Sequence, residues 1–199
     1  MVAGEIYEEV KKNYGLKLNK NRLLWGSIAP DYLPYYKIKS HYKKDSLDFI
    51  VREIVSLILV YRFVDLDNMN KTMLNFLSRK IGVISHYMCD FTCRPHMLNQ
   101  SFKNNMKEHM DYEKRLNEFS KYFVPKRIEI ISESNNYDVE DNNLMAEIKS
   151  KIENVINVYS GKDPGYDVDL NFGLTLSMAT LDIIMENVSV VSERAYATI

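Results

Sequence analysis

Apolar residues recur at intervals of three and four over most of the chain, which is the periodicity of helices that bury one face. The pattern predicts helices over about residues 5–14, 47–63, 71–93, 102–123, 144–159 and 172–195. Ser46 is expected to cap the helix that begins at residue 47. The last helix is apolar on most sides and is expected to be central. No segment shows a confident alternation with period two, so the predicted fold class is all-α.

Two segments interrupt this helical pattern. Residues 16–46 contain Pro30, Pro34 and several aromatic residues, which indicates an ordered connection rather than a regular element. Residues 132–143 are the most polar stretch and are expected to form an exposed loop. The 199 residues, 46% of them hydrophobic and 27% charged, suffice for one well-filled core, so a single domain over 1–199 is predicted.

Composition excludes several classes of partner. With 26 basic and 27 acidic residues, the chain offers no electrostatic basis for stable binding to duplex nucleic acid or to an anionic membrane surface. The longest apolar run, Leu57–Tyr61, is too short to span a bilayer, so no transmembrane segment is expected. The first residues lack the apolar core of a secretory signal, which predicts a cytoplasmic protein, or a secreted one if the true start lies upstream. The oligomeric state stays open.

The candidate chemistry lies between residues 86 and 113, which hold three of the four histidines. His86 and Asp90 stand four residues apart, as do His109 and Glu113, so each pair lies on one face of a helix. For one such pair alone, a solvated or hydrogen-bonded pair is the simpler interpretation. Two pairs joined by His96 fit a metal site equally well, and imidazole with carboxylate favours zinc. Spacing alone leaves both interpretations open.

The spacing His86-x3-Asp90-x5-His96-x12-His109-x3-Glu113 resembles the metal signature of the bacterial zinc-dependent phospholipase C family. The fold of that family is shared by the P1 nucleases. Upstream, the sequence GSIAPD, which ends at Asp31, and the later His41 are similar to the remaining Asp and His ligands of the family, in the same order. The resemblance therefore implies a multi-helix domain of the phospholipase C/P1 nuclease type.

The resemblance also implies two sets of zinc ligands. The first zinc would be held by Asp31, His41, His86 and Asp90. The second would be held by His96, His109 and Glu113, and three protein ligands leave a position open for water or a phosphate oxygen. The counterpart of Asp31 in the family is also proposed as the general base.

The chain departs from the family at the third metal. Family members bind that ion through the amino-terminal residue, a His of the first helix and the counterpart of Asp90, whereas this chain begins with Met and has no His before His41. Two zinc ions are therefore expected, and activity is uncertain without the third. We hypothesise that the missing His lies upstream of Met1. Trp25 is internal and is expected to be a packing residue.

Three further residues are candidates for substrate binding. Tyr32 matches an aromatic that contacts choline in family members, and Ile38 stands where a Phe is expected. The isoleucine offers no π face, and packing is the simpler interpretation for it. Arg94 could clamp a phosphate or pair with a core carboxylate. Cys89 and Cys93 are too few for a disulfide framework and are expected to pack in the interior.

The predicted function is a zinc-dependent phosphoester hydrolase of the phospholipase C type, which converts a phospholipid into diacylglycerol and a phosphorylated head group. One alternative is an intracellular phosphodiesterase like the P1 nucleases, acting on another phosphodiester. A second is a metal-binding relative without catalytic activity. Aromatic platforms that stack bases would favour the nuclease, and an exposed apolar lip around the site would favour the lipase.

Overall fold

The computed structural model describes residues 1–38, 40–66, 68–98, 106–130 and 141–196, and within these ranges every regular element is a helix. The predicted all-α class is therefore confirmed. In chain order the helices are α1 (Val2–Tyr14), α2 (Lys20–Gly26), α3 (Ala29–Tyr32), α4 (Pro34–Lys37), α5 (Lys43–Tyr61), α6 (Lys71–Phe91), α7 (Arg94–Met97), α8 (Met106–Ser120), α9 (Asp141–Ser160) and α10 (Tyr166–Tyr196).

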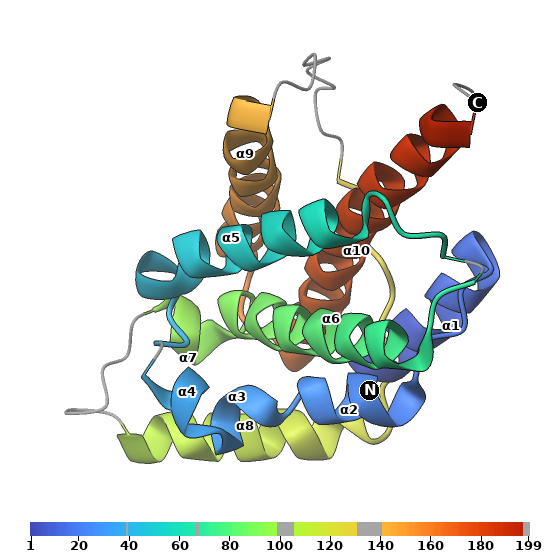
Figure 1. The fold of residues 1–199 in the computed structure, drawn as a ribbon. Coiled ribbons are helices and arrows are strands. Elements are labelled where there is room, and N and C mark those ends of the chain that lie inside the picture. Colours follow the sequence, from blue (N-terminus) through green and yellow to red (C-terminus); the bar gives the residue numbers. More distant parts are fainter. Residues whose placement is uncertain (39, 67, 99–105, 131–140, 197–199) are drawn as a thin grey trace.

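Helix α6 occupies the centre of the fold and packs against α2, α5 and α10 (Figure 1). In Figure 1, α5 lies on one side of α6, and the short helices α2–α4 lie on the other side together with α8. Buried side chains of α6 include Ile81, Tyr87, Met88 and Phe91, which belong to the main hydrophobic core. The last two turns of α6 therefore lie between the segments that supply the other candidate ligands.

Two glycines let α2 and α6 approach until their backbones touch. A Cβ atom added at Gly82 of α6 would clash with the carbonyl oxygen of Leu23 and lie 2.8 Å from the amide nitrogen of Ser27. A Cβ atom added at Gly26 of α2 would clash with the carbonyl oxygen of Arg79. Only glycine fits at such a contact. The close approach places the end of α2 directly against α6.

The connection over residues 16–46 differs from the prediction because it contains three short helices. The side chain of Asn19 caps α2 by accepting a hydrogen bond from the amide of Arg22 at 3.2 Å. Pro30 and Pro34 lie in the first turns of α3 and α4, where a missing amide proton costs nothing. The prolines therefore begin helices here.

The predicted cap of α5 is wrong. Helix α5 begins at Lys43 after Tyr42, and the hydroxyl of Ser46 donates to the carbonyl oxygen of Tyr42 at 2.9 Å from within the first turn. The helix predicted over 71–93 is likewise two helices, because α6 ends at Phe91 and α7 follows after a turn.

The other predicted helices are confirmed with shifted boundaries. Helix α1 begins at Val2, α8 ends at Ser120, and α10 begins at Tyr166. The start predicted near residue 102 and most of the polar loop predicted over 132–143 lie outside the described residues, while 141–143 belong to α9.

Helix α10 has the central position that its apolar sequence predicts. By length and composition its stretch Tyr166–Val188 could cross a membrane, which the sequence analysis did not anticipate, but 78% of the apolar window is buried against the rest of the fold. That is the packing of a core helix, so the stretch is weak evidence for a membrane span.

Candidate metal centre

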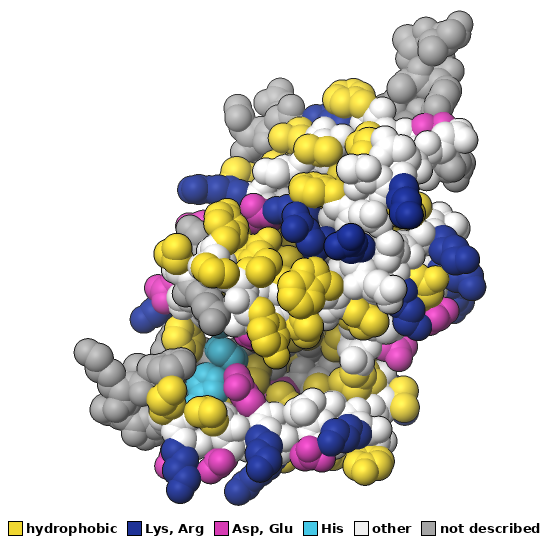
Figure 2. All heavy atoms as spheres, turned by 60° about the horizontal axis from the view of Figure 1, so that its bottom comes forward, with side chains coloured by type: hydrophobic (Ala, Val, Ile, Leu, Met, Phe, Trp, Pro, Cys, Tyr) yellow, Lys and Arg dark blue, Asp and Glu magenta, His cyan; other side chains and the backbone are white. Residues whose placement is uncertain are grey.

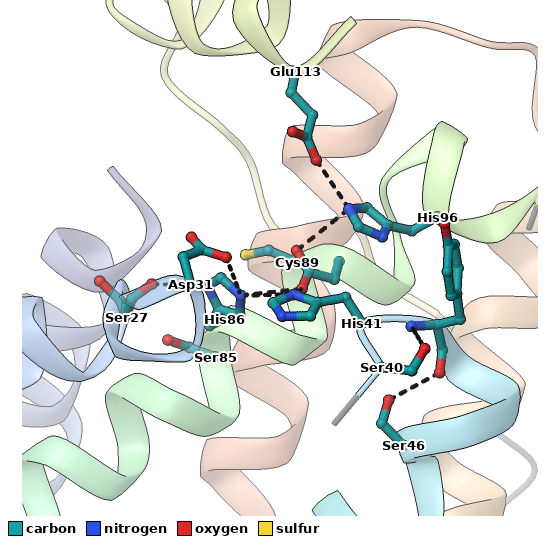
Figure 3. Close-up of polar contacts among 12 residues, drawn as sticks. Ser27, Asp31, Ser40, His41, Ser46, Ser85, His86, Cys89, His96 and Glu113 are labelled. Carbon is teal, nitrogen blue, oxygen red and sulfur yellow. Dashed lines mark hydrogen bonds and ion pairs between the residues drawn. The ribbon is translucent and has the colours of Figure 1, made fainter. Parts of the chain in front are cut away.

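Asp31, His41 and His86 form the first group of candidate ligands, with one ligand atom from each lying within 4.8 Å of the others. Asp31 comes from α3, His41 from the segment before α5, and His86 from α6. Asp90, one turn after His86, places its Oδ2 atom 2.7 Å from His41 Nδ1 and 3.2 Å from His86 Nε2. Four side chains of three different segments therefore converge at one place. Figure 3 shows Asp31, His41 and His86 directed at one another.

His96, His109 and Glu113 form the second group, again with ligand atoms within 4.8 Å of one another. The Oε1 atom of Glu113 lies 3.0 Å from His96 Nε2 and 2.9 Å from His109 Nε2. Two imidazole nitrogens thus point at the same carboxylate oxygen. His96 belongs to the single turn of α7, and the other two side chains share one face of α8.

Asp90 connects the two groups. Its Oδ2 atom faces the first group, and its Oδ1 atom lies 4.0 Å from His96 Nε2 of the second. In Figure 3, His96 lies between Glu113 and the pair formed by His41 and His86. All seven predicted ligands therefore lie together in the fold.

A cleft of about 290 Å³ opens beside these residues. His86, Asp90 and Glu113 contribute its charged and polar wall, and Figure 2 shows histidine and acidic side chains at a hollow of the surface. The wall also contains apolar residues from four helices, namely Val2, Leu24, Leu116 and Leu170. The cleft thus joins the candidate ligands to an apolar surface.

The orientation of His86 is set by a residue that the sequence analysis did not single out. His86 Nδ1 lies 2.9 Å from the carbonyl oxygen of Ser27 at the end of α2. A carbonyl can only accept, so Nδ1 carries the proton and Nε2 presents its lone pair to the first group when the ring is neutral. Metal-binding histidines are commonly held in this way.

The charges within the first group stabilise one another. Burial lowers the pKa of His86, but the charges of Asp90 and Asp31 and the hydrogen bonds of the ring outweigh it and raise the pKa from 6.5 to about 9. Burial by itself would raise the pKa of Asp90, yet the charge of His86 and the hydrogen bonds from His41 and His86 hold it well below its usual range. When His86 is protonated, it forms a largely buried ion pair with Asp90, with Nε2 and Oδ2 3.2 Å apart.

The second group behaves similarly. The hydrogen bond from His96 lowers the pKa of Glu113 despite burial. Burial lowers the pKa of His96, and the hydrogen bond to Glu113 with the charge of Asp90 reverses this and raises it. The Nδ1 atom of His96 is buried and has no hydrogen-bond partner among the described residues.

These donor atoms suit zinc. Each group combines imidazole nitrogens with carboxylate oxygens, and their nitrogens approach one another closely, with His41 Nδ1 and His86 Nε2 only 3.2 Å apart. When the imidazoles are neutral, their lone pairs converge and repel one another, and a bound cation removes this repulsion. Cys89 is a poorer candidate, because burial raises the pKa of its thiol to about 12. Cys93 is buried, and both thiols are free.

Asp169 is the second residue that the sequence analysis missed. This carboxylate of α10 is 4% exposed and accepts hydrogen bonds from the hydroxyls of Tyr159 at 2.7 Å and Tyr112 at 2.8 Å, and from the amide of Arg94 at 3.1 Å. Tyr112 precedes Glu113 on α8, and Arg94 begins the helix of His96. Asp169 therefore ties both segments of the second group to α10. A carboxylate within an apolar helix was the only available signal.

The predicted substrate residues lie in different environments. Tyr32 is 66% exposed beside Asp31, and Ile38 is 83% exposed, so packing is the wrong interpretation for the isoleucine. The charge of Arg94 lowers the pKa of the buried Asp169, which supports the alternative that Arg94 pairs with a core carboxylate. Trp25 was expected to be a packing residue, but 40% of its surface on α2 is exposed, so it packs only in part.

The first residues of α1 also reach the cleft, since Met1, Val2 and Ala3 line it opposite Asp90 and Glu113. They contain no histidine, so they add no imidazole ligand to the cleft.

Comparison with known proteins assigns the family. No curated protein and no solved structure matches the chain. The family model described as zinc dependent phospholipase C matches residues 1–163, which include all seven candidate ligands. The chain, with its all-α fold, belongs to the zinc-dependent phospholipase C family.

Proposed function

We propose that this protein binds two zinc ions and hydrolyses the phosphodiester bond between the diacylglycerol and the head group of a phospholipid. Family membership supports the reaction class. The observation that carries the proposal is the position of Asp90, whose two oxygens face two separate groups of histidine and carboxylate ligands at one cleft. Such an arrangement suits paired cations that act on one phosphate.

The residues present fit the two ions. Asp31, His41, His86 and Asp90 would hold the first, and His96, His109 and Glu113 the second. When bound, zinc polarises the phosphodiester and lowers the pKa of water toward neutrality. The second group offers only three protein ligands, which leaves room for a phosphate oxygen.

Asp31 is the proposed general base. Its Oδ1 atom lies 3.6 Å from His86 Nε2, while 56% of its side chain stays exposed. This exposure leaves the carboxylate accessible to a water molecule beside the first group of ligands, from which it can accept the proton as the water attacks phosphorus. His86 is fixed by Ser27 and keeps its Nε2 atom directed at the same place.

The apolar part of the cleft favours a lipid over a soluble phosphodiester. Leu24, Leu116 and Leu170 lie in the same wall as the candidate ligands. A glycerol backbone with its acyl chains buries apolar surface there, whereas a nucleotide would leave these side chains without a matching partner. Hydrolysis of a soluble nucleotide diester is therefore the competing activity to be measured.

The test combines metal content with turnover. Elemental analysis of the purified protein is expected to give two zinc ions per chain, and absence of zinc after mild dialysis would contradict the proposal.

Hydrolysis of a short-chain phosphatidylcholine should exceed that of a dinucleotide, and Asp31→Asn should lower kcat by at least about a hundredfold. Asp163→Asn, an exposed carboxylate in the turn before α10, is the control and should leave the rate unchanged. Equal rates in Asp31→Asn and the parent would remove Asp31 from the mechanism.

A further inference from the structure

The short helices α2–α4 expose six large apolar side chains on the surface beside the cleft. Figure 2 shows hydrophobic side chains gathered next to the hollow that holds the histidines. The exposed fractions range from 40% for Leu24 to 83% for Ile38. We call this surface the α2–α4 patch, and it consists of Leu24, Trp25, Ile28, Tyr32, Tyr35 and Ile38.

The segment that carries most of the patch has few charged residues. From residue 23 to residue 36 the only charged side chain is Asp31, and that carboxylate faces His86 at 3.6 Å. The nearest basic residues along the chain are Arg22, which is exposed, and Lys37, which ends α4 and directly precedes Ile38. One charged residue among these fourteen is few for a protein in which 27% of the residues are charged.

The patch is continuous with the candidate metal centre. Leu24 and Ser27 line the cleft, and Tyr32 follows Asp31 on the single turn of α3. Any surface that contacts the patch therefore lies across the mouth of the cleft. This inference rests on the proposed function, because a phospholipid in a bilayer can reach the candidate ligands only if the mouth of the cleft faces that bilayer.

The composition of the patch matches the interfacial region of a bilayer. Trp and Tyr are the residues that favour the level of the lipid head groups, since their rings are apolar and their polar atoms stay hydrated. Ile28 and Ile38 add aliphatic surface that can reach the boundary of the acyl chains. Between residues 23 and 36 no basic side chain is available to attract anionic lipids, so the patch suits a lipid surface without net charge.

We propose that the α2–α4 patch docks the protein on the surface of a zwitterionic phospholipid bilayer and so places the cleft over a head group. Docking depends on inserted aromatic and aliphatic side chains, and it should respond little to salt. It should also survive the loss of turnover, because the docking side chains are separate from Asp31 and the histidines.

The chain contains its own reporter for this contact. Trp25 is the only tryptophan, so all tryptophan fluorescence comes from the patch. Vesicles of phosphatidylcholine are expected to shift the emission of the zinc-loaded protein to shorter wavelength, and brominated lipids should quench it. An emission spectrum unchanged by vesicles, in a preparation that hydrolyses a monomeric short-chain phosphatidylcholine, overturns the docking proposal while the proposed function stands.

Substitution locates the contact. The variant Trp25→Ser/Ile28→Ser/Tyr35→Ser removes one large aliphatic and two aromatic side chains. None of the three residues belongs to either group of candidate ligands. Co-sedimentation with vesicles should show partitioning weakened by about tenfold or more. The control Leu59→Ser/Val60→Ser/Phe63→Ser removes three side chains of similar exposure, 44%, 52% and 76%, from the last turn of α5 and the turn that follows it. In Figure 1, α5 lies on the other side of α6 from α2–α4. The control should partition like the parent.

The outcomes separate the two proposals. Hydrolysis of a monomeric short-chain phosphatidylcholine should be equal in the patch variant and the parent, and only hydrolysis of vesicles should fall. If both triple variants lose partitioning equally, the patch is not the docking surface. Insertion of Trp25 without hydrolysis of any phospholipid would refute the proposed function and leave docking intact. An emission shift that follows protein concentration without lipid, with a dimer in sedimentation, would assign the patch to a second copy of this chain and overturn the inference.

Discussion

The Nδ1 atom of His86 lies 2.9 Å from the carbonyl oxygen of Ser27, across the contact between α6 and α2. This hydrogen bond depends on the close approach of the two helices at Gly82 and Gly26, one turn before the histidine. The packing of two glycines thereby controls the direction of a candidate zinc ligand.

Replacing Gly82 by alanine should therefore disturb both stability and metal binding. The new methyl group would meet backbone atoms of Leu23 and Ser27, which cannot rotate away, and overpacking of this kind costs about 1–3 kcal/mol. Chemical denaturation should show the loss of stability, and titration calorimetry should show weaker zinc binding.

Gly4→Ala is the control, since nothing lies within 4 Å of a Cβ atom there. Its stability should stay equal or rise by up to about 1 kcal/mol. Equal behaviour of the two variants would contradict the role of the glycine contact.

Asp169 should affect zinc at the second group more than at the first. Asp169→Asn weakens the acceptor shared by Tyr112 and the amide of Arg94, so the segments that carry His96 and Glu113 lose their common anchor. Loss of such an outer partner typically lowers metal affinity by about 10–100-fold. Zinc titration should still show one tight site and should show the second weakened.

The matched control for this prediction is Asp167→Asn, which changes an exposed carboxylate of the same helical turn. It should bind two zinc ions like the parent. A uniform weakening of both ions in Asp169→Asn, in proportion to lost stability, would indicate a general structural role instead.

Asp90 should be required for both ions. Its Oδ2 atom is 2.7 Å from His41 Nδ1, and its Oδ1 atom is 4.0 Å from His96 Nε2. Asp90→Asn removes the negative charge between the groups and should weaken both zinc sites by at least about tenfold. Glu113→Gln should weaken only the second. Metal analysis after gel filtration distinguishes the variants, and two retained zinc ions in Asp90→Asn would refute the bridging position.

Zinc binding should release a proton from His86. In the zinc-free protein burial lowers the pKa of His86, but Asp90 and Asp31 raise it from 6.5 to about 9. A folded pKa above the unfolded value means that the proton stabilises the folded protein. That contribution is complete below pH 6.5 and is lost as the pH rises through about 9.

Zinc competes with this proton, so its apparent affinity should rise between pH 6.5 and about 9 and then level off. Titration calorimetry in buffers of different ionisation enthalpy measures the protons released. His86→Gln should lose this part of the pH dependence together with much of its zinc affinity. An affinity that is constant over the same range would show that His86 binds zinc without losing a proton, which contradicts the prediction.

Local sequence determined the long helices and the two His/carboxylate pairs. Residues four apart on a helix share a face whatever the rest of the fold does, so His86 with Asp90 and His109 with Glu113 could be paired from spacing. The start of α5 was misplaced because Ser46 can either cap a helix or donate to a carbonyl of the preceding turn, and sequence does not distinguish the two. Pro30 and Pro34 were ambiguous as well, because a proline can either interrupt a helix or stand in its first turn, as both do here.

The sequence by itself determined the helical class, the family and the seven candidate ligands, because periodicity and motif spacing are properties of the chain. Only the tertiary structure decided that Ser27 orients His86, that Asp169 anchors the second group, and that the α2–α4 patch lies beside the cleft. These relationships join residues distant in sequence through backbone carbonyls, buried hydroxyls and surface position. Such contacts leave no fixed spacing in the chain, since they exist only after the helices have packed.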